Sequence, residues 1–264
     1  MLLSFFLKQQ VVSGAASKPL YVWGSGSYGK TTFNTNISSW TIVSAGGSHT
    51  AAIRSGGTLF TWGYNGSGRL GDGTTINKLS PVQIGSSSWT FVSARLSHTA
   101  AITSTGTLFT WGLNTYGQLG DGTTITRSSP VQIGSSSWTT VSAGRTHTAA
   151  IRSGGTLFTW GQGTSGQLGD NTLSNKSSPV QIGSSSWTTV SAGRTHTAAI
   201  LSEGTLFTWG SGSFGLLGDG TIVNKSSPVI LGGIGLDVSS PIQIGSSSWT
   251  TVSAGGVHTL GITL

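Results

Sequence analysis

Short stretches of alternating apolar and polar residues run along the chain, separated by clusters of Gly, Ser, Asp and Pro. In one representative stretch this pattern predicts four strands, at Trp138–Ala143, His147–Ile151, Leu157–Trp160 and Val180–Ile182. Alternation with β-branched residues favours strands, and the clusters between them, Ser-Ser-Pro included, predict turns. Strands of this length at roughly ten-residue spacing are typical of a sandwich, a barrel or a propeller.

The four-strand pattern recurs at a constant interval of 49 residues. The 24 residues Ser128–Ile151 return unchanged as Ser177–Ile200. Four columns of residues keep the interval: Trp40, Trp89, Trp138 and Trp187; Trp62, Trp111, Trp160 and Trp209; His49, His98, His147 and His196; Asp72, Asp121, Asp170 and Asp219. A four-stranded repeat of this length indicates a propeller, in which each blade buries its faces on its neighbours.

The fifth copy of the repeat is split between the two ends of the chain. Trp249–Leu264 matches the first part of a repeat, and Leu20–Gly24 (LYVWG) matches the part that follows, Leu-Phe-Thr-Trp-Gly in the other copies. A linear array would need caps at both ends, whereas a ring needs its ends to meet. We therefore predict an all-β, five-bladed β-propeller over residues 18–264, whose last blade is closed by the N- and C-terminal strands.

Two motifs at fixed spacing resemble the regulator of chromosome condensation repeat family over about residues 18–264. One is Ala-Gly-x-x-His-Thr, as at Ala143–Thr148 and Ala192–Thr197. The other is Trp-Gly-x-x-x-x-Gly-x-Leu-Gly-Asp, at Trp62–Asp72, Trp111–Asp121, Trp160–Asp170 and Trp209–Asp219. The resemblance implies a β-propeller with a blade shared between the termini, although family propellers typically have seven blades and five are predicted here.

The family resemblance implies binding rather than one particular activity. The eukaryotic founder catalyses nucleotide exchange on a small GTPase and docks on chromatin, and other members inhibit β-lactamases or sense ultraviolet light. A fold of this kind hosts unrelated functions. The near-identical copies in this chain are similar to arrays of bacterial and phage proteins.

The composition excludes several classes of protein and of site. The chain has 264 residues, of which 42 are Gly, ten are Trp, none is Cys and only 7% are charged. Low charge with many Trp excludes an ordinary disordered chain, and the absence of Cys excludes disulfides, thiolate nucleophiles and Cys zinc sites. No run of eighteen apolar residues exists that would span a membrane as a helix.

The titratable residues do not assemble a recognisable catalytic set. Four of the six acidic residues are the repeat Asp, expected to accept local backbone hydrogen bonds in turns. Glu203 and Asp237 remain, and a glycosidase needs two facing carboxylates. No Gly-x-Ser-x-Gly elbow follows a strand and opens a helix. We predict no enzyme activity, no catalytic residue and no cofactor.

The His and Trp columns each have a functional and a structural interpretation. Five His at equivalent positions, the fifth being His258, could form a metal ring. We favour imidazoles that stabilise turns by bonding to backbone, and therefore no metal site. The two Trp columns could stack on sugars, but Trp in a strand with β-branched neighbours usually packs in the core.

The formal net charge is +7. One set of cations at the repeat interval predicts a basic rim: Lys78, Arg127, Lys176 and Lys225. Arg145 and Arg194 share a second register, and Arg54 and Arg152 a third. A basic rim could bind phosphate backbones, but without a basic run or interleaved aromatic platform we favour solvated loops over nucleic-acid binding.

Two irregular segments stand outside the repeats and are predicted to bind partners. Residues 1–17 form an apolar N-terminal arm without a leading positive charge, which makes a poor secretion signal. A 13-residue insertion near 230–240 is apolar and Gly-rich. The predicted partner-binding residues are Leu2, Leu3, Phe5, Phe6, Leu7, Ile230, Leu231, Ile234 and Leu236.

Together these features predict a non-enzymatic binding or structural module in a larger assembly. We expect a phage or viral virion protein, serving in decoration, in a tail or in receptor binding, anchored by its N-terminal arm and facing a host receptor or glycan. The predicted location is the particle, or otherwise the cytoplasm. Two alternatives remain open: a soluble regulator of a GTPase or chromatin partner, and a lectin-like sugar-binding propeller.

Overall fold

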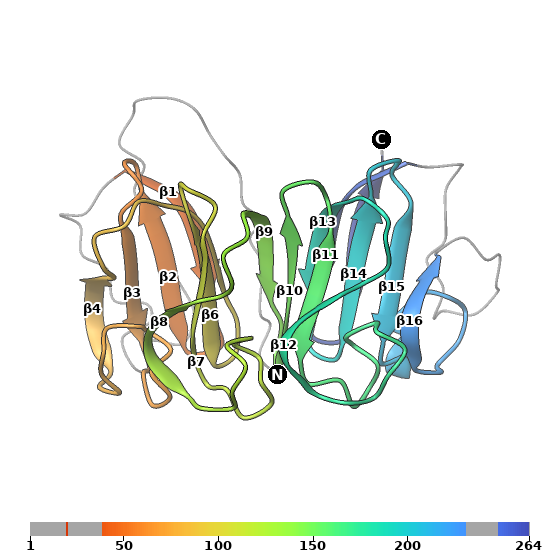
Figure 1. The fold of residues 1–264 in the computed structure, drawn as a ribbon, viewed down its shortest axis with the longest axis horizontal. Helices are drawn as coiled ribbons and strands as arrows, with labels where there is room; N and C mark the ends of the chain where they lie inside the picture. Colours follow the sequence, from red (N-terminus) through yellow and green to blue (C-terminus); the bar gives the residue numbers. More distant parts are fainter. Residues whose placement is uncertain (1–19, 21–38, 231–247, 264) are drawn as a thin grey trace.

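The computed structural model of the chain describes residues 20, 39–230 and 248–263, and nearly all of its regular structure is β-strand. Four sheets have four strands each, and a fifth has two. Figure 1 shows these sheets standing side by side as successive blades. A short 3₁₀ turn, Ser213–Gly215, interrupts one loop.

Strands at the same place in successive sheets carry the same sequence motif. The first strands are β1 (Trp40–Ala45), β5 (Trp89–Ala94), β9 (Trp138–Ala143), β13 (Trp187–Ala192) and β17 (Trp249–Ala254). The second strands are β2 (His49–Arg54), β6 (His98–Thr103), β10 (His147–Arg152), β14 (His196–Leu201) and β18 (Thr259–Thr263). The third strands are β3 (Leu59–Gly63), β7 (Leu108–Gly112), β11 (Leu157–Gly161) and β15 (Leu206–Gly210). The fourth strands are β4 (Lys78–Gln83), β8 (Arg127–Gln132), β12 (Lys176–Gln181) and β16 (Lys225–Ile230).

Each complete blade is an antiparallel meander in which neighbours in sequence are neighbours in the sheet. The predicted first three strands of the third copy are confirmed to within one residue. The predicted fourth strand overlaps β12, but its predicted start is wrong: β12 begins at Lys176 rather than Val180, so Ser-Ser-Pro lies inside a strand and not in a turn. Pro179 is tolerated because β12 pairs on one side only, with β11, and an edge strand can lack an N–H group on its open side.

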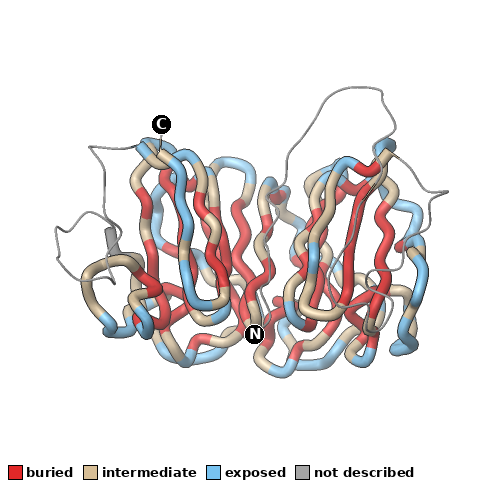
Figure 2. The backbone as a smooth tube through the Cα atoms, turned by 180° about the vertical axis from the view of Figure 1, so that it is seen from behind, coloured by how far each residue is buried: buried red, intermediate tan, exposed pale blue. Residues whose placement is uncertain are grey.

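The apolar core between adjacent blades is built from the same kinds of residue at successive boundaries. At the second boundary, Ile102 and Leu108 of one blade pack against Trp138, Val141 and Trp160 of the next. Figure 2 shows this burial as red strands beneath exposed loops. A fully buried Trp removes about 200–250 Å² from water, or roughly 5 kcal/mol. Both Trp columns of the four complete blades therefore belong to the core, as predicted.

A hydrogen-bonded joint crosses each boundary beside this core. The carbonyl oxygen of Gln118 accepts a hydrogen bond from Nε1 of Trp160 at 3.0 Å and another from Oγ1 of Thr148 at 2.8 Å. Nε2 of His98 lies 2.9 Å from the same Thr148 hydroxyl. Since that hydroxyl donates its proton to the carbonyl, the imidazole must be the donor, so His98 carries its proton on Nε2.

Close approach at the joint depends on a left-handed glycine. Gly120 has φ +80°, and a Cβ atom there would lie 2.6 Å from Nε1 of Trp160. Only glycine allows both the backbone conformation and the contact. This explains the Gly of the repeated Leu-Gly-Asp sequence.

The predicted backbone partner of the repeated His is wrong. Each buried His instead reaches a Thr hydroxyl of the next blade at 2.9 Å, in the pairs His49–Thr99, His98–Thr148, His147–Thr197 and His196–Thr259. Each Thr directly follows the His of its own blade, but it bonds to the His of the preceding blade, 50 or 63 residues earlier. Sequence spacing alone could not identify this partner, because the contact depends on which blades are neighbours. The fifth His, His258, is exposed.

Burial in the joint suppresses protonation of these imidazoles. Loss of solvation lowers the pKa of His49, His98 and His147 to about 3 and that of His196 to about 4. Neighbouring cations and imidazoles lower these pKa values further. All four rings are therefore neutral at ordinary pH, as the donor geometry requires.

The fifth sheet contains β17 and β18 alone, and in the described part of the chain it does not pack against β1 as neighbouring blades pack together. On β18, Leu260 and Ile262 are 63% and 61% exposed. The predicted closing strand, residues 20–24, lies outside the described residues apart from Leu20. Leu20 packs against the Trp40 and Trp62 cluster, as Leu59 packs against the equivalent Trp89 cluster. Closure of the ring stays a prediction.

Acid should unfold the protein steeply. The pKa of each buried His is lower in the folded chain than its ordinary value of 6.5. The stability that depends on neutral imidazoles is therefore complete above pH 6.5 and is lost as pH falls towards the folded-state pKa. Four such groups lower the free energy of unfolding by about 5 kcal/mol per pH unit between about pH 6 and 4.

Urea unfolding of the wild type and of H147Q between pH 7.5 and 4.5 measures this slope. The Gln amide can donate to Thr197 but does not titrate, so H147Q should lose about a quarter of the slope. The matched control is H258Q, at the exposed fifth position, which should keep the wild-type slope. Equal slopes in H147Q and wild type would contradict the assignment.

Candidate functional site

The two ends of the blades differ in chemistry. The antiparallel order places the turns between first and second strands at the same end as the long loops between third and fourth strands, which we call the loop face. The opposite end, the serine face, holds the other turns and the connections between blades. Apart from the buried Ile84, Ile133 and Ile182, the described segments of the serine face contain only Ser, Thr, Gly and Glu203.

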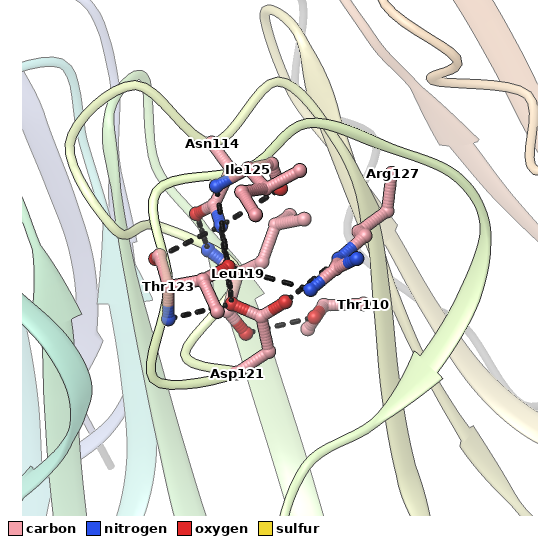
Figure 3. A network of polar contacts seen from close by, with 7 residues as sticks. All are labelled: Thr110, Asn114, Leu119, Asp121, Thr123, Ile125 and Arg127. Carbon is pink, nitrogen blue, oxygen red and sulfur yellow. Dashed lines mark hydrogen bonds and ion pairs between the residues drawn. The ribbon is translucent and has the colours of Figure 1, made fainter.

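A polar network centred on the repeat Asp shapes each long loop, and its Asp–Thr bonds recur in all four complete blades. Figure 3 shows the second loop, where Asn114 joins the network, whereas Gly163 and Gly212 take the place of this Asn in the third and fourth loops. Oδ1 of Asp121 accepts hydrogen bonds from N and Oγ1 of Thr123, at 3.0 and 2.7 Å, and from Nδ2 of Asn114 at 3.1 Å. Oδ1 of Asn114 accepts from the Leu119 backbone at 2.9 Å, and Thr110 donates to the Leu119 carbonyl at 2.7 Å. The predicted local bonding of the repeat Asp is confirmed.

The second carboxylate oxygen of each repeat Asp is paired with a cation. Oδ2 of Asp121 lies 2.9 Å from Nε of Arg127. Equivalent pairs join Asp72 to Lys78 at 3.3 Å, Asp170 to Lys176 at 3.5 Å and Asp219 to Lys225 at 3.6 Å. These are the four cations of the predicted basic rim. Because each is paired with the Asp of its own blade, the rim carries little excess positive charge.

In the first two blades the network holds the carboxylates of Asp72 and Asp121 ionised. Burial alone would raise the pKa of Asp121, but hydrogen bonds from Thr123 and the charge and hydrogen bond of Arg127 outweigh it and lower the pKa. The pKa of Asp72 is lowered in the same way by Thr74, Lys78 and Asn65. Acceptors with this many satisfied bonds are structural rather than poised for proton transfer.

Large apolar side chains stand exposed at the tips of the long loops. Ile76, Ile125, Leu173, Ile222 and Val223 are between 58% and 71% exposed and represent all four complete blades. We call the first four the tip residues. Phe214, on the fourth loop, is 85% exposed and has φ +61°, which is unusual for an aromatic residue.

These apolar residues were not among the predicted site residues, because they lie in the loops and not in the repeated strands. A signal was present: an aliphatic residue recurs three or four positions after each repeat Asp, in loops otherwise made of Gly, Thr, Ser and Asn. An apolar residue in such a loop has no strand neighbour to bury it. Exposure in every blade had to be read from the structure.

Of the predicted partner-binding residues, only Ile230 lies within the described part of the chain. Leu2, Leu3, Phe5, Phe6, Leu7, Leu231, Ile234 and Leu236 lie outside the described residues. Ile230 ends β16 and pairs with Phe207 of β15. Within the described ranges, no three His or carboxylate side chains gather as metal ligands would. No helix in those ranges is long and apolar enough to span a membrane.

The fold and the repeated loops define the class of protein. The sequence profile of the RCC1-like domain matches residues 11–261. The chain therefore belongs to the RCC1-like family of repeat propellers, as its motifs indicated.

Solved structures of low sequence identity share this fold. Human WBSCR16 is 21% identical with a TM-score of 0.79, covering 91% of this chain and 66% of its own. Yeast RCC1 (Prp20), solved bound to Kap60, is 20% identical with a TM-score of 0.73, covering 85% of this chain and 54% of its own. A second structure of Prp20p, from Saccharomyces cerevisiae, is 21% identical with a TM-score of 0.73 and covers 85% of this chain and 56% of its own. The chain thus spans between about half and two thirds of these relatives.

Removing the repeat carboxylate should loosen its loop. Asp121→Ala deprives Thr123, Asn114 and Arg127 of their acceptor, and lost hydrogen bonds to a charged group cost about 1.5–3 kcal/mol. Thr124→Ala, at an exposed position of the same loop, is the matched control and should cost under about 0.5 kcal/mol. Urea unfolding at pH 7.5 measures both. A cost for Asp121→Ala no larger than the control's would refute a structural role for the network.

Proposed function

We propose that this chain is a non-catalytic protein-binding module whose loop face docks on partner proteins. The observation that carries the proposal is the set of exposed tip residues, Ile76, Ile125, Leu173 and Ile222. Exposed apolar groups gathered on one face, with a polar opposite face, are typical of protein interaction sites.

The loop geometry suits such docking. Each tip follows the Asp-centred network that holds its loop, so little conformational freedom is lost on binding. The neighbouring cations are already neutralised by the repeat Asp. Burying one aliphatic side chain contributes about 1.5–3 kcal/mol, so several tips engaged together would supply useful affinity.

The site chemistry supports binding over catalysis. The four described Asp carboxylates are each taken up by a cation and by local donors. The buried imidazoles are engaged with Thr hydroxyls and cannot protonate at ordinary pH. Neither set offers an exposed acid–base pair.

A second candidate is regulation of a GTPase or chromatin partner. It is favoured by the likeness to Prp20. That protein was solved bound to Kap60, and it binds Gsp1p and histones. Measured nucleotide exchange on a small GTPase from the source organism decides it. A rate equal to the uncatalysed rate would end this candidate.

A narrower proposal is that the chain is a virion component anchored by the arm at residues 1–17. It is supported by the sequence alone, through the apolar character of the arm. Sedimentation of the native protein, with mass spectrometry of what travels with it, tests this. Comigration with capsid or tail proteins would support the particle role, and migration as a free 26.9 kDa chain would count against it. The lectin-like alternative would require hits on a glycan array.

Polar substitution of the tips should abolish partner capture. In I76S/I125S/L173S/I222S, recovery of cross-linked partners from source extract should fall at least about tenfold, because roughly 1.4 kcal/mol of lost burial already gives that factor. The thermal midpoint should stay near that of the wild type, since the tips are exposed.

The matched control changes four exposed residues of the serine face, S86A/S135A/S153A/S184A, and should capture partners as the wild type does. Quantitative mass spectrometry of the cross-linked partners reads out all three proteins. Equal capture by the tip variant and the wild type would remove the loop face as the docking surface.

A further inference from the structure

The fourth long loop differs from the other three at one exposed position. Phe214 occupies the place held by Ser67, Tyr116 and Ser165 in the other complete blades. Its side chain is 85% exposed, more than any other large apolar side chain in the described part of the chain. An aromatic ring that stays in water contributes none of the free energy that burial provides. The stability of the fold therefore does not account for a Phe at this position.

The backbone at Phe214 is also strained. Its φ of +61° is left-handed, whereas Ser67, Tyr116 and Ser165 do not have a positive φ. A Cβ atom disfavours this conformation, and bulky residues adopt it least. Strained residues persist where the surrounding structure fixes them, and they gather at binding sites. An exposed and strained aromatic residue therefore points to a role in binding.

A change two residues further along the chain accompanies this strained turn. In the second loop, Oε1 of Gln118 accepts a hydrogen bond from the Tyr116 amide at 2.9 Å, and the third loop has the equivalent bond at 2.8 Å. Leu216 stands at that place in the fourth loop, and its side chain has no acceptor. This loop forms the 3₁₀ turn Ser213–Gly215, which no other long loop of the four complete blades contains. The exposed ring is thus presented by a turn that is specific to one blade.

The two halves of the fourth loop are in contact beside this turn. A Cβ atom on Gly212 would clash with the backbone of Val223. The Gly212 amide also donates to Oδ1 of Asn224 at 3.0 Å. Ile222 and Val223, in the second half of the loop, are 71% and 59% exposed. These two aliphatic side chains therefore share a loop tip with Phe214.

The neighbouring blade adds one more exposed apolar residue. The Leu216 carbonyl accepts a hydrogen bond from Oγ1 of Thr259 at 3.0 Å, which joins the fourth loop to the start of β18. Val257, two residues earlier in the turn between β17 and β18, is 56% exposed. The exposed apolar residues where the fourth blade meets the fifth form what we call the Phe214 patch: Phe214, Ile222, Val223 and Val257.

The fourth loop carries no net charge. Residues 211–225 contain one acid and one base, Asp219 and Lys225, which pair at 3.6 Å. Segments that bind a membrane surface combine apolar side chains with Lys and Arg that attract anionic lipids. A neutral apolar tip therefore favours a protein surface over a lipid surface.

The size of the patch favours a short partner segment over a second copy of this chain. Four side chains present a patch of a few hundred Å², in the range that is often functional on a monomer. A standard interface between two proteins buries about 800 Å² on each. The loop around the patch contains no strand to which a partner strand could add. One apolar helix face matches both the area and the absence of a strand edge.

We propose that the Phe214 patch binds the apolar face of a short amphipathic helix of a partner protein, an inference that rests on the loop face being a protein-binding surface. Such a helix presents apolar side chains three and four positions apart on one side. Phe214 is the anchor of the site, because buried aromatic residues dominate the affinity of interfaces. Since the equivalent places hold Ser or Tyr, the partner is directed to one blade of the array.

The test selects ligands on the full chain. A display library of random peptides of about 16 residues, or roughly four helical turns, is selected on the wild type, and the enriched peptides are synthesised with fluorescein. Fluorescence anisotropy measures their affinity for the wild type, F214S and I125S. Phe214→Ser installs the residue of the first and third blades, and Ile125→Ser removes an exposed apolar tip from the second blade as the matched control. Thermal unfolding checks that both variants fold.

We expect enriched peptides with apolar residues three or four positions apart, whose binding weakens at least about tenfold in F214S and less than about threefold in I125S. A selection that enriches no peptide, or peptides that bind F214S as tightly as the wild type, would overturn the proposal. Equal weakening in both variants would do the same. Binding of the wild type to phosphatidylcholine and phosphatidylserine vesicles that F214S loses would replace the helix with a lipid surface.

Phe214→Gly separates binding from a structural role. Glycine adopts a positive φ without strain, so F214G should raise the thermal midpoint by about 2–4 °C while it binds the peptides as weakly as F214S. A lower midpoint together with lost binding would make Phe214 a structural residue and overturn the proposal.

The variants keep the two proposals apart. F214S retains all four tip residues, and the tip variant of the preceding section retains Phe214. If the selected peptides bind independently of Phe214 while the tip variant still loses its partners, the docking role of the loop face stands and only the helix site is removed.

Discussion

The carbonyl oxygen of Gln118 accepts two hydrogen bonds from the next blade, one from the indole of Trp160 and one from the hydroxyl of Thr148. The hydroxyl oxygen in turn accepts a hydrogen bond from Nε2 of His98. This arrangement recurs at successive boundaries, so the order of the blades depends on it. Apolar packing supplies most of the free energy at these boundaries, but it is non-directional. The directional bonds set how one blade meets the next.

The joint also connects the fold to the loop face. Gln118 lies in the same long loop as Asp121, one residue before Leu119, whose amide and carbonyl are held by Asn114 and Thr110. The loop that anchors the next blade is therefore the loop that presents Ile125 to solvent. The same segment thus stabilises the blade boundary and carries the tip proposed to bind partners, which explains how a loop rich in Gly and Thr can hold an apolar tip in place.

Departures from the repeat distinguish one blade from another on the loop face. Identical blades give identical loops, and identical loops distribute their charges evenly. Arg95 in place of Gly and Phe214 in place of Ser or Tyr break that equivalence. Arg95 reaches Gly255 across the blades, and Phe214 stands exposed in a left-handed conformation. A partner that recognises one orientation of the array needs such differences, because symmetric blades present equivalent surfaces.

The sequence by itself determined the repeat length, the blade count, three of the four strands in a blade and the burial of both Trp columns, because these follow from local periodicity and apolar spacing. Only the tertiary structure decided that β12 contains Pro179, that His147 bonds to Thr197, that Lys78 is neutralised by Asp72 and that Arg95 bonds to the Gly255 carbonyl. Each of these depends on which blades or loops lie side by side. The local sequence pattern indicates which polar residues need a hydrogen-bond or ion-pair partner. The chain topology determines which partner lies close enough to bond.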